Sequence, residues 1–131
     1  MMKQGQIIAA YKALSRLSEQ VLPITTAWAI AKTRAVLKPF WEFQLNEERR
    51  YFEMQNYRVS AGGDIVFSDS RIDAEFRQRM AELANMDQDV SVERFTLRMD
   101  DSIELSARDV EALAGIVDFE GAGNDAENQA K

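Results

Sequence analysis

The chain has 131 residues, of which 46% are hydrophobic and 29% are charged, and its formal net charge is −6. This length and balance are typical of one folded domain rather than of a disordered chain. Because the sequence contains neither cysteine nor histidine, disulfides, catalysis by a thiol or an imidazole, and Cys/His zinc sites are excluded.

Two antiparallel helices are predicted at the start of the chain. Apolar residues recur at steps of three and four from Ile7 to Val21, which predicts a helix over residues 3–20. Pro23 ends this helix, because proline cannot donate a helical hydrogen bond, and a second helix is expected from about Thr25. The connection is short, so the two helices should pack antiparallel.

The second helix is expected to run to about Gln55 with Pro39 inside it. The proline ring would clash with the carbonyl group four residues earlier, so the pattern predicts a kink or a break at this point. The large aromatic side chains of Trp28, Phe40 and Trp41 are expected to hold the helices together rather than to line a ligand site.

A β-hairpin and a third helix are predicted next. The segment Tyr57-Arg58-Val59-Ser60 is separated from Ile65-Val66-Phe67 by Ala61-Gly62-Gly63-Asp64, and the paired glycines favour a tight turn between two strands. Such a hairpin needs a third strand or a helix to lean on. Ser70 with Asp73 is typical of a helix cap, and the apolar spacing that follows predicts a helix over residues 72–85.

The last predicted elements are a strand and a short helix. Residues 90–99 alternate as a strand does, and one slip of phase at Glu93-Arg94 predicts a β-bulge. Ser106 with Asp109 repeats the capping pattern and starts a final helix, whose apolar stripe extends to Val117.

These elements predict an α+β fold: an antiparallel helical hairpin with a long kinked second helix, a small antiparallel β-sheet and two shorter helices. We expect a single domain over residues 1–119 and a disordered acidic tail over residues 120–131. The most apolar stretch, Val21–Phe43, is interrupted by charges and a proline, so no membrane span is expected. The first residues lack the apolar core of a signal peptide, which favours a cytoplasmic location.

No catalytic, metal-binding or cofactor-binding residue is predicted, and the chain is expected not to be an enzyme. The glycine-rich phosphate-binding motifs are absent. Asp87-x-Asp89, and Asp100-Asp101 with Glu104, could supply oxygens to a hard cation, but the pattern of a calcium loop is missing. Turn formation and solvation are the favoured interpretation of these acids.

Charge is distributed unevenly along the sequence. Residues 1–40 carry six basic residues and one acidic residue, whereas residues 41–131 carry ten and 21. From Asp100 to Glu127 there are nine acids and a single arginine, Arg108. Such a surface could occupy a basic nucleic-acid groove, and the alternative interpretation is a solvated helix start with an acidic tail. The candidate partner-binding residues are Asp100, Asp101, Glu104, Asp109 and Glu111.

Five segments of the sequence follow each other in a recognisable order. They are GQIIAAYKALSRLSEQVLPITTAWAIAKTRAVLKPF, NEERRYFE, FRQRMAELANMD, VSVERFTL and LSARDVEALAGIV. The order and spacing of these segments resemble a family of small uncharacterised proteins encoded by tailed phages and prophages of Gram-positive bacteria. The likeness covers residues 4–118. It implies a viral origin and a small, non-enzymatic role, and it implies no site residues.

Two functions follow as hypotheses. The first is a phage-encoded protein that binds another protein, in virion assembly or on a host target, within the cytoplasm of the bacterial host. The second is an anti-CRISPR or other anti-defence inhibitor whose acidic surface blocks a basic nucleic-acid-binding channel. The partner is then a phage structural protein or a host defence effector, with no direct binding of nucleic acid and no membrane. Self-association stays open, because the helix stripes can be satisfied within one chain or between two.

The two hypotheses differ in what should abolish binding. An inhibitor that mimics nucleic acid with its acidic surface should bind in a salt-sensitive way that depends on Asp100, Asp101 and Glu104. An assembly partner should bind through an apolar patch and depend on Trp28 or Tyr11, provided that these side chains are exposed.

Overall fold

The computed structural model describes residues 1–54, 56–99 and 103–121, which form four helices and six short strands. The helices are α1 (Gln4–Leu17), α2 (Ile24–Met54), α3 (Ser70–Ala84) and α4 (Ala107–Leu113). The strands are β1 (Met2–Lys3), β2 (Tyr57–Val59), β3 (Ile65–Phe67), β4 (Asp87–Gln88), β5 (Phe95–Met99) and β6 (Val117–Gly121). The expected α+β class is confirmed.

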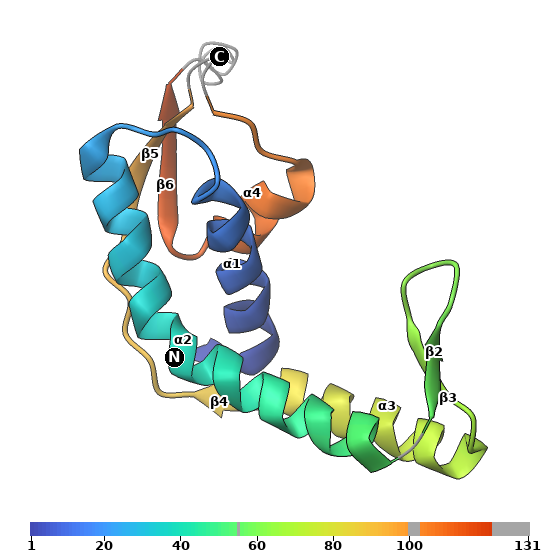
Figure 1. Ribbon diagram of the computed structural model, residues 1–131. Helices are drawn as coiled ribbons and strands as arrows, with labels where there is room; N and C mark the ends of the chain where they lie inside the picture. Colours follow the sequence, from blue (N-terminus) through green and yellow to red (C-terminus); the bar gives the residue numbers. More distant parts are fainter. Residues whose placement is uncertain (55, 100–102, 122–131) are drawn as a thin grey trace, which may run out of the picture.

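The helices α1 and α2 form the predicted antiparallel hairpin, α4 packs on the other side of α1, and β5 and β6 contribute Leu97 and Val117 to the same core (Figure 1). α1 is therefore the central helix of the main core, and its side chains Ile7, Leu14 and Leu17 are fully buried. Each such side chain contributes roughly 1.5–3 kcal/mol of apolar burial. From the neighbouring elements, Leu37 of α2 and Leu113 of α4 join the same cluster.

The long helix α2 continues through Pro39 without a break, and its ribbon changes direction between the two halves (Figure 1). The predicted kink is confirmed and the alternative of a break is not. Proline removes one helical hydrogen bond at this point. Just after the proline, the carbonyl oxygen of Phe40 accepts a hydrogen bond of 2.9 Å from Nε2 of Gln4, which ties the start of α1 to the bend.

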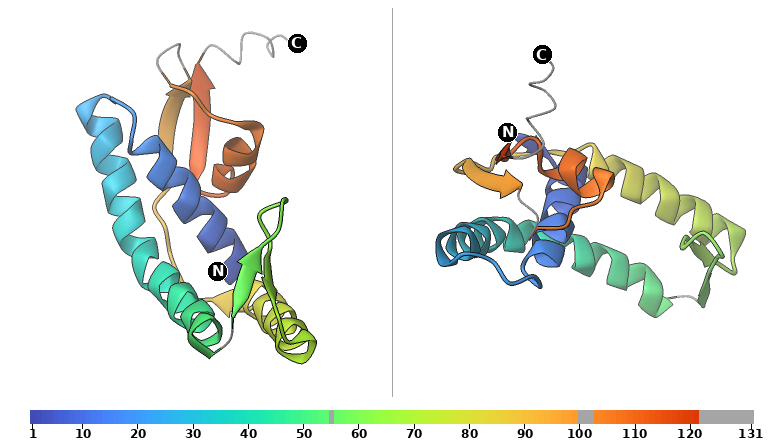
Figure 2. Two further views of the ribbon diagram at one scale, coloured as in Figure 1. Left: turned by 45° about the vertical axis from the view of Figure 1, so that its right-hand side comes forward. Right: turned by 90° about the horizontal axis from the view of Figure 1, so that it is seen from above.

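A second, smaller cluster lies at the far end of α2. The hairpin β2–β3 is antiparallel with Tyr57 opposite Phe67, as predicted, and it packs against α3 and the last turns of α2. The rings of Tyr51, Phe67 and Phe76 are buried there, with centroids 5.0 Å apart for Phe67 and Phe76. Figures 1 and 2 show this arm extending away from α4, β5 and β6.

The strand pairing differs from the single antiparallel sheet that was predicted. The described residues form three separate two-stranded sheets, of which β1–β4 and β2–β3 are antiparallel. The third pair, β5–β6, is parallel. The predicted bulge is wrong: β5 begins only at Phe95, and Val90 and Val92 lie in irregular chain that packs against the core.

The end of the last helix also differs from the prediction. α4 ends at Leu113, and Val117 starts β6 instead of extending the helical stripe. The guanidinium group of Arg94 explains the reversal, because it donates to the carbonyl oxygens of Gly115 at 2.6 Å and Val117 at 3.3 Å. β6 runs through Gly121, so the first two residues of the predicted tail belong to a strand, and residues 122–131 lie outside the described residues.

Local capping was predicted correctly at one helix and incorrectly at another. Ser106 caps α4 by accepting a hydrogen bond of 3.1 Å from the backbone N–H of Asp109, as expected. At α3 the cap is Asp69, whose carboxylate accepts from the N–H of Arg71, and Ser70 is already helical. Asp73 instead accepts a hydrogen bond from the backbone N–H of Phe67 and so ties α3 to the hairpin.

Candidate functional site

The acidic residues that the sequence singled out do not form one surface. Asp109 is only 6% exposed, and its carboxylate accepts hydrogen bonds from Nε and Nη2 of Arg16 on α1. These bonds hold the pKa of Asp109 below its usual value. The carboxylate therefore joins α4 to α1 and is not available to a partner.

The remaining candidates stand apart from Asp109. Glu104 and Glu111 are exposed, and Asp100 and Asp101 lie outside the described residues. The backbone of Glu104 is fixed by the side chain of Gln20, through hydrogen bonds of 3.1 and 2.7 Å. Of the candidates that the structure describes, only Glu104 and Glu111 therefore present a carboxylate to solvent.

Arginines neutralise further acids of the C-terminal third. Asp118 forms an ion pair of 2.6 Å with Arg94, and the hydrogen bond lowers the pKa of this carboxyl. Glu120 lies 3.5 Å from Arg98 on the neighbouring strand β5. The negative surface is consequently weaker than a count of acids along the sequence indicates.

An apolar surface runs along the first half of α2 instead. Ile24, Trp28, Lys32 and Val36 recur every four residues and so share one face, which we call the α2 ridge. Ile24 is 82%, Trp28 63% and Val36 42% exposed, and Nζ of Lys32 lies 5.9 Å from the centre of the Trp28 ring. Val21, in the segment that connects α1 to α2, is also 95% exposed.

The exposure of Trp28 corrects the expectation that it packs between the helices. The inward face of α2 is built by Ile30, Thr33 and Leu37, all buried, which places Trp28 on the other side. The other two aromatic residues behave as predicted: Phe40 packs against the core, and Trp41 stacks on the buried ring of Tyr11 with centroids 5.1 Å apart.

A small hollow adjoins the C-terminal end of the α2 ridge, at Lys32 and Val36. It has a volume of about 240 Å³ and lies between α2 and the segment 92–95. Val36, Val92 and Phe95 supply apolar surface, and Lys32 lies 3.9 Å from Glu93 at the hollow. Small-molecule sites have volumes of roughly 300–1,000 Å³, so this hollow fits an inserted side chain better than a substrate.

The described residues contain no constellation typical of catalysis or metal binding. Among them, no group of three or more carboxylates is placed to hold a metal ion, and Asp87 forms an ion pair of 3.2 Å with Lys3. The buried Glu47 pairs with Arg79 at 2.7 Å and with Arg50 at 3.2 Å, and these arginines lower its pKa. Carboxyl groups held ionised by arginines are typical of structural ion pairs rather than of a general acid.

The part of the chain that the structure describes has no helix with an apolar stretch sufficient to cross a membrane. No protein family model, curated protein or solved structure matches the chain. The phage origin therefore stays a prediction, and function has to be inferred from the surfaces that the chain itself presents.

Proposed function

We propose that the chain is a phage-encoded, non-enzymatic protein that acts by binding another protein through the α2 ridge. The observation that carries this proposal is the exposed Trp28, flanked on the same helix face by Ile24 and Val36. Apolar side chains gathered into one exposed patch mark interaction surfaces, and tryptophan is enriched among the residues that dominate binding energy. The phage origin is supported by the resemblance in the order of segments.

The ridge and the hollow beside it have complementary roles in such an interface. Ile24 and Trp28 present a continuous apolar strip that can lie against an apolar groove or helix of the partner. The hollow next to Val36 accepts a side chain of the partner, and the charges of Lys32 and Glu93 at the hollow help to fix its orientation. The partner is a virion component or a host target.

The test is recovery of partners from lysates of infected and uninfected host cells at low and then moderate salt, with identification by mass spectrometry. The wild-type chain is compared with a double variant, Ile24→Ser with Trp28→Ala. Because truncated hot-spot residues cost about 2 kcal/mol or more, recovery of the partner should fall at least about tenfold. Val59→Ser is the matched control, since Val59 is an exposed apolar residue on the hairpin, away from the ridge.

The opposite result supports the acidic anti-defence alternative. In that case binding disappears at moderate salt, is lost in a variant with Glu104→Gln and Glu111→Gln, and survives the double substitution on the ridge. The captured protein would then be a nucleic-acid-dependent defence effector such as a CRISPR complex.

A further inference from the structure

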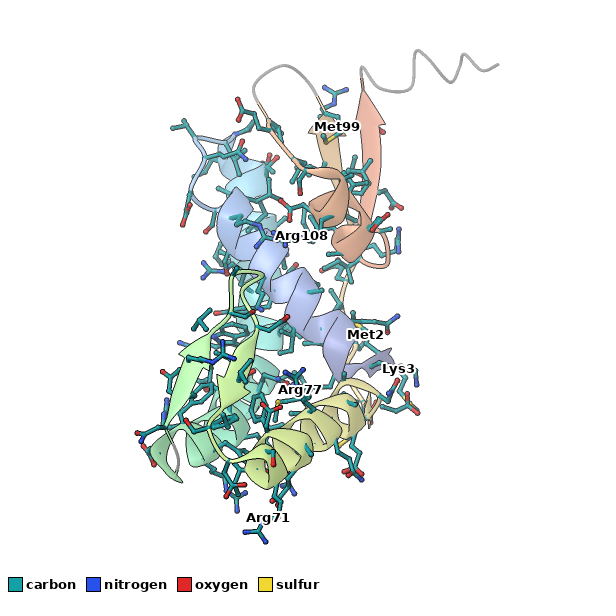
Figure 3. All side chains as sticks on the ribbon, turned by 90° about the vertical axis from the view of Figure 1, so that its right-hand side faces the viewer. Met2, Lys3, Arg71, Arg77, Met99 and Arg108 are labelled. Atoms are coloured by element: carbon teal, nitrogen blue, oxygen red, sulfur yellow. The ribbon has the colours of Figure 1, made fainter. Side chains whose placement is uncertain are left out.

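Three cationic side chains gather in an open groove between α1 and α4. The groove has a volume of about 520 Å³, and its cations are Lys12 and Arg16 from α1 and Arg108 from α4. Figure 3 faces this side of the molecule and labels Arg108 where the two helices adjoin. The rest of the lining is apolar and mostly small: Gly5, Ile8, Ala9 and Ala112.

The spacing of these residues explains how the groove forms. Positions 5, 9, 12 and 16 follow each other at steps of four, three and four, so they lie along one face of α1. Positions 108 and 112 form the facing row on α4. The small side chains at positions 5, 9 and 112 leave room, while the long side chains of the three cations border it.

The ion pair between Arg16 and Asp109 prepares the groove for a ligand. The carboxylate of Asp109 accepts from Nε and Nη2 of Arg16, so the guanidinium group is fixed in place. A guanidinium group has five N–H donors, and those on Nη1 are not engaged by Asp109. The same ion pair holds α4 against α1 and so sets the width of the groove.

The groove carries an excess of positive charge. No carboxylate lines it, and no described carboxylate lies within salt-bridge distance of Lys12 or Arg108. Nζ of Lys12 lies 5.9 Å from the centre of the Trp41 ring, over its face. Cations gathered along a concave surface raise the local potential and favour the binding of an anion.

We propose that this groove binds a small phosphate monoester. Arginine matches the oxygens of a phosphate in a bidentate way, and lysine adds a mobile point charge. The volume lies within the range of sites for small ligands. Ile8 and the two alanines of the groove contact the uncharged part of the ligand, which makes a nucleoside monophosphate a better fit than free phosphate. This site is separate from the α2 ridge and does not depend on the function proposed for it.

The probes are inorganic phosphate and adenosine 5′-monophosphate, titrated against the full chain. The sequence has two tryptophans, so Trp28→Phe leaves Trp41 as the reporter beside Lys12. We expect a saturable change in Trp41 fluorescence with a Kd of about 1 mM or lower, tighter for the nucleotide than for inorganic phosphate. Sulfate at equal ionic strength controls for simple screening.

Variants then locate the site by calorimetry. Lys12→Met and Arg108→Gln each remove one exposed cation without touching the core, and each should weaken nucleotide binding at least tenfold. Arg71→Gln on α3 is the matched control, because it removes an exposed arginine far from the groove and should leave the affinity unchanged. Circular dichroism confirms that each variant is folded.

Three outcomes would overturn the proposal. The first is the absence of saturable binding by either phosphate probe. The second is binding that Arg71→Gln weakens as much as Arg108→Gln does, which would indicate non-specific attraction. The third is binding of a hexaglutamate peptide with neither phosphate probe bound, which would make the groove a docking surface for an acidic protein segment.

Discussion

Asp109 lies in the acid-rich C-terminal third of the sequence, but its buried carboxylate joins α4 to α1. Its carboxylate pairs with Arg16, 93 residues away in sequence, and its own backbone N–H donates to the capping hydroxyl of Ser106. Sequence patterns predicted the cap, because Ser106 and Asp109 are three residues apart. They could not predict the ion pair, since nothing local indicates that Arg16 faces the start of α4.

Replacing this carboxylate should destabilise the fold. Asp109→Asn removes the negative charge beside Arg16 and replaces one of the two acceptor oxygens with an NH2 group. We therefore expect the free energy of unfolding to fall by about 1–2 kcal/mol. Urea unfolding at neutral pH measures this change. Glu111→Gln is the control, because Glu111 is exposed on the same helix and should change stability by less than about 0.5 kcal/mol. Equal effects of the two substitutions would show that the ion pair contributes nothing.

The lowered pKa of Asp109 also predicts how stability depends on pH. In the unfolded chain the carboxyl has an ordinary pKa of about 3.9, whereas Arg16 lowers it in the folded state. The unfolded state therefore takes up a proton first, so the stabilisation is complete above the ordinary pKa and is lost as pH falls through the lowered one. Glu47, whose pKa Arg79 lowers, adds to the same trend. Denaturation curves from pH 6 down to about pH 2.5 should show a shallower loss of stability for Asp109→Asn than for the wild type, whereas parallel curves would contradict this assignment.

Among the elements, the hairpin depends most clearly on a single residue. Gly63 has a φ of +90°, which side-chain-bearing residues rarely adopt, and its N–H donates to the carbonyl oxygen of Ser60 at 2.9 Å. Gly62 has no such backbone requirement, and a Cβ added there would meet only ordinary contacts. The Gly-Gly pair in the sequence predicted the turn correctly, and the structure shows which glycine the turn requires.

The two glycines provide a matched pair of substitutions. Gly63→Ala should destabilise the hairpin by about 1–2 kcal/mol, because alanine is strained at positive φ. Gly62→Ala should change stability by less than about 0.5 kcal/mol. Amide exchange of the hairpin residues, followed by NMR, measures both effects locally. Loss of protection in the Gly62 variant alone would contradict the structure.

The sequence predicts individual helices and strands better than it predicts which strands pair. The helices α1 and α3 and the hairpin follow from local periodicity and turn residues, and the structure confirms them. The parallel pair β5–β6 does not, because α4 lies between the two strands in sequence and each strand has only five residues. Val117 fits the helical spacing set by Val110 and Leu113, so the sequence placed it in the last helix. The hydrogen bonds from Arg94 to the carbonyl groups after α4 show why the helix ends earlier.

Of the candidate site, the sequence named Trp28 alone, and only on the condition that its side chain is exposed. The first half of α2 is apolar on two faces, one with Ile30 and Leu37 and one with Ile24 and Trp28. Helical spacing alone predicts both faces equally well, and only the position of α1 decides which one is covered. The sequence therefore shows that the first half of α2 has a second apolar face. It does not show that this face is exposed.

On the scale of the whole molecule, one helix joins two clusters of unequal size. The main core surrounds α1, and the aromatic cluster around Tyr51, Phe67 and Phe76 lies at the far end of α2 (Figure 2). The buried Gln4 adds a polar junction between the two parts. Its Nε2 donates to the carbonyl oxygen of Phe40, its Oε1 accepts from Gln88 at 2.9 Å, and its N–H donates to the carbonyl oxygen of Met86 at 2.8 Å.

This division predicts that the arm opens before the rest of the molecule unfolds. Phe76→Ala removes a ring that contacts both Tyr51 and Phe67, and truncation of a buried phenylalanine costs about 3–5 kcal/mol. Among the described residues, the buried side chains of this cluster are only Tyr51, Phe67 and Phe76, so this loss should exceed what α3 and the hairpin can absorb. Native-state hydrogen exchange should then show α3 and β2–β3 unprotected, with α1 and β5 retaining protection. Leu14→Ala, a truncation in the main core, should instead lower the protection of α1, α4 and β5 together. If Phe76→Ala reduced protection equally in α1 and α3, the two clusters would unfold as one unit, and the arm could not move independently of the α2 ridge and the groove.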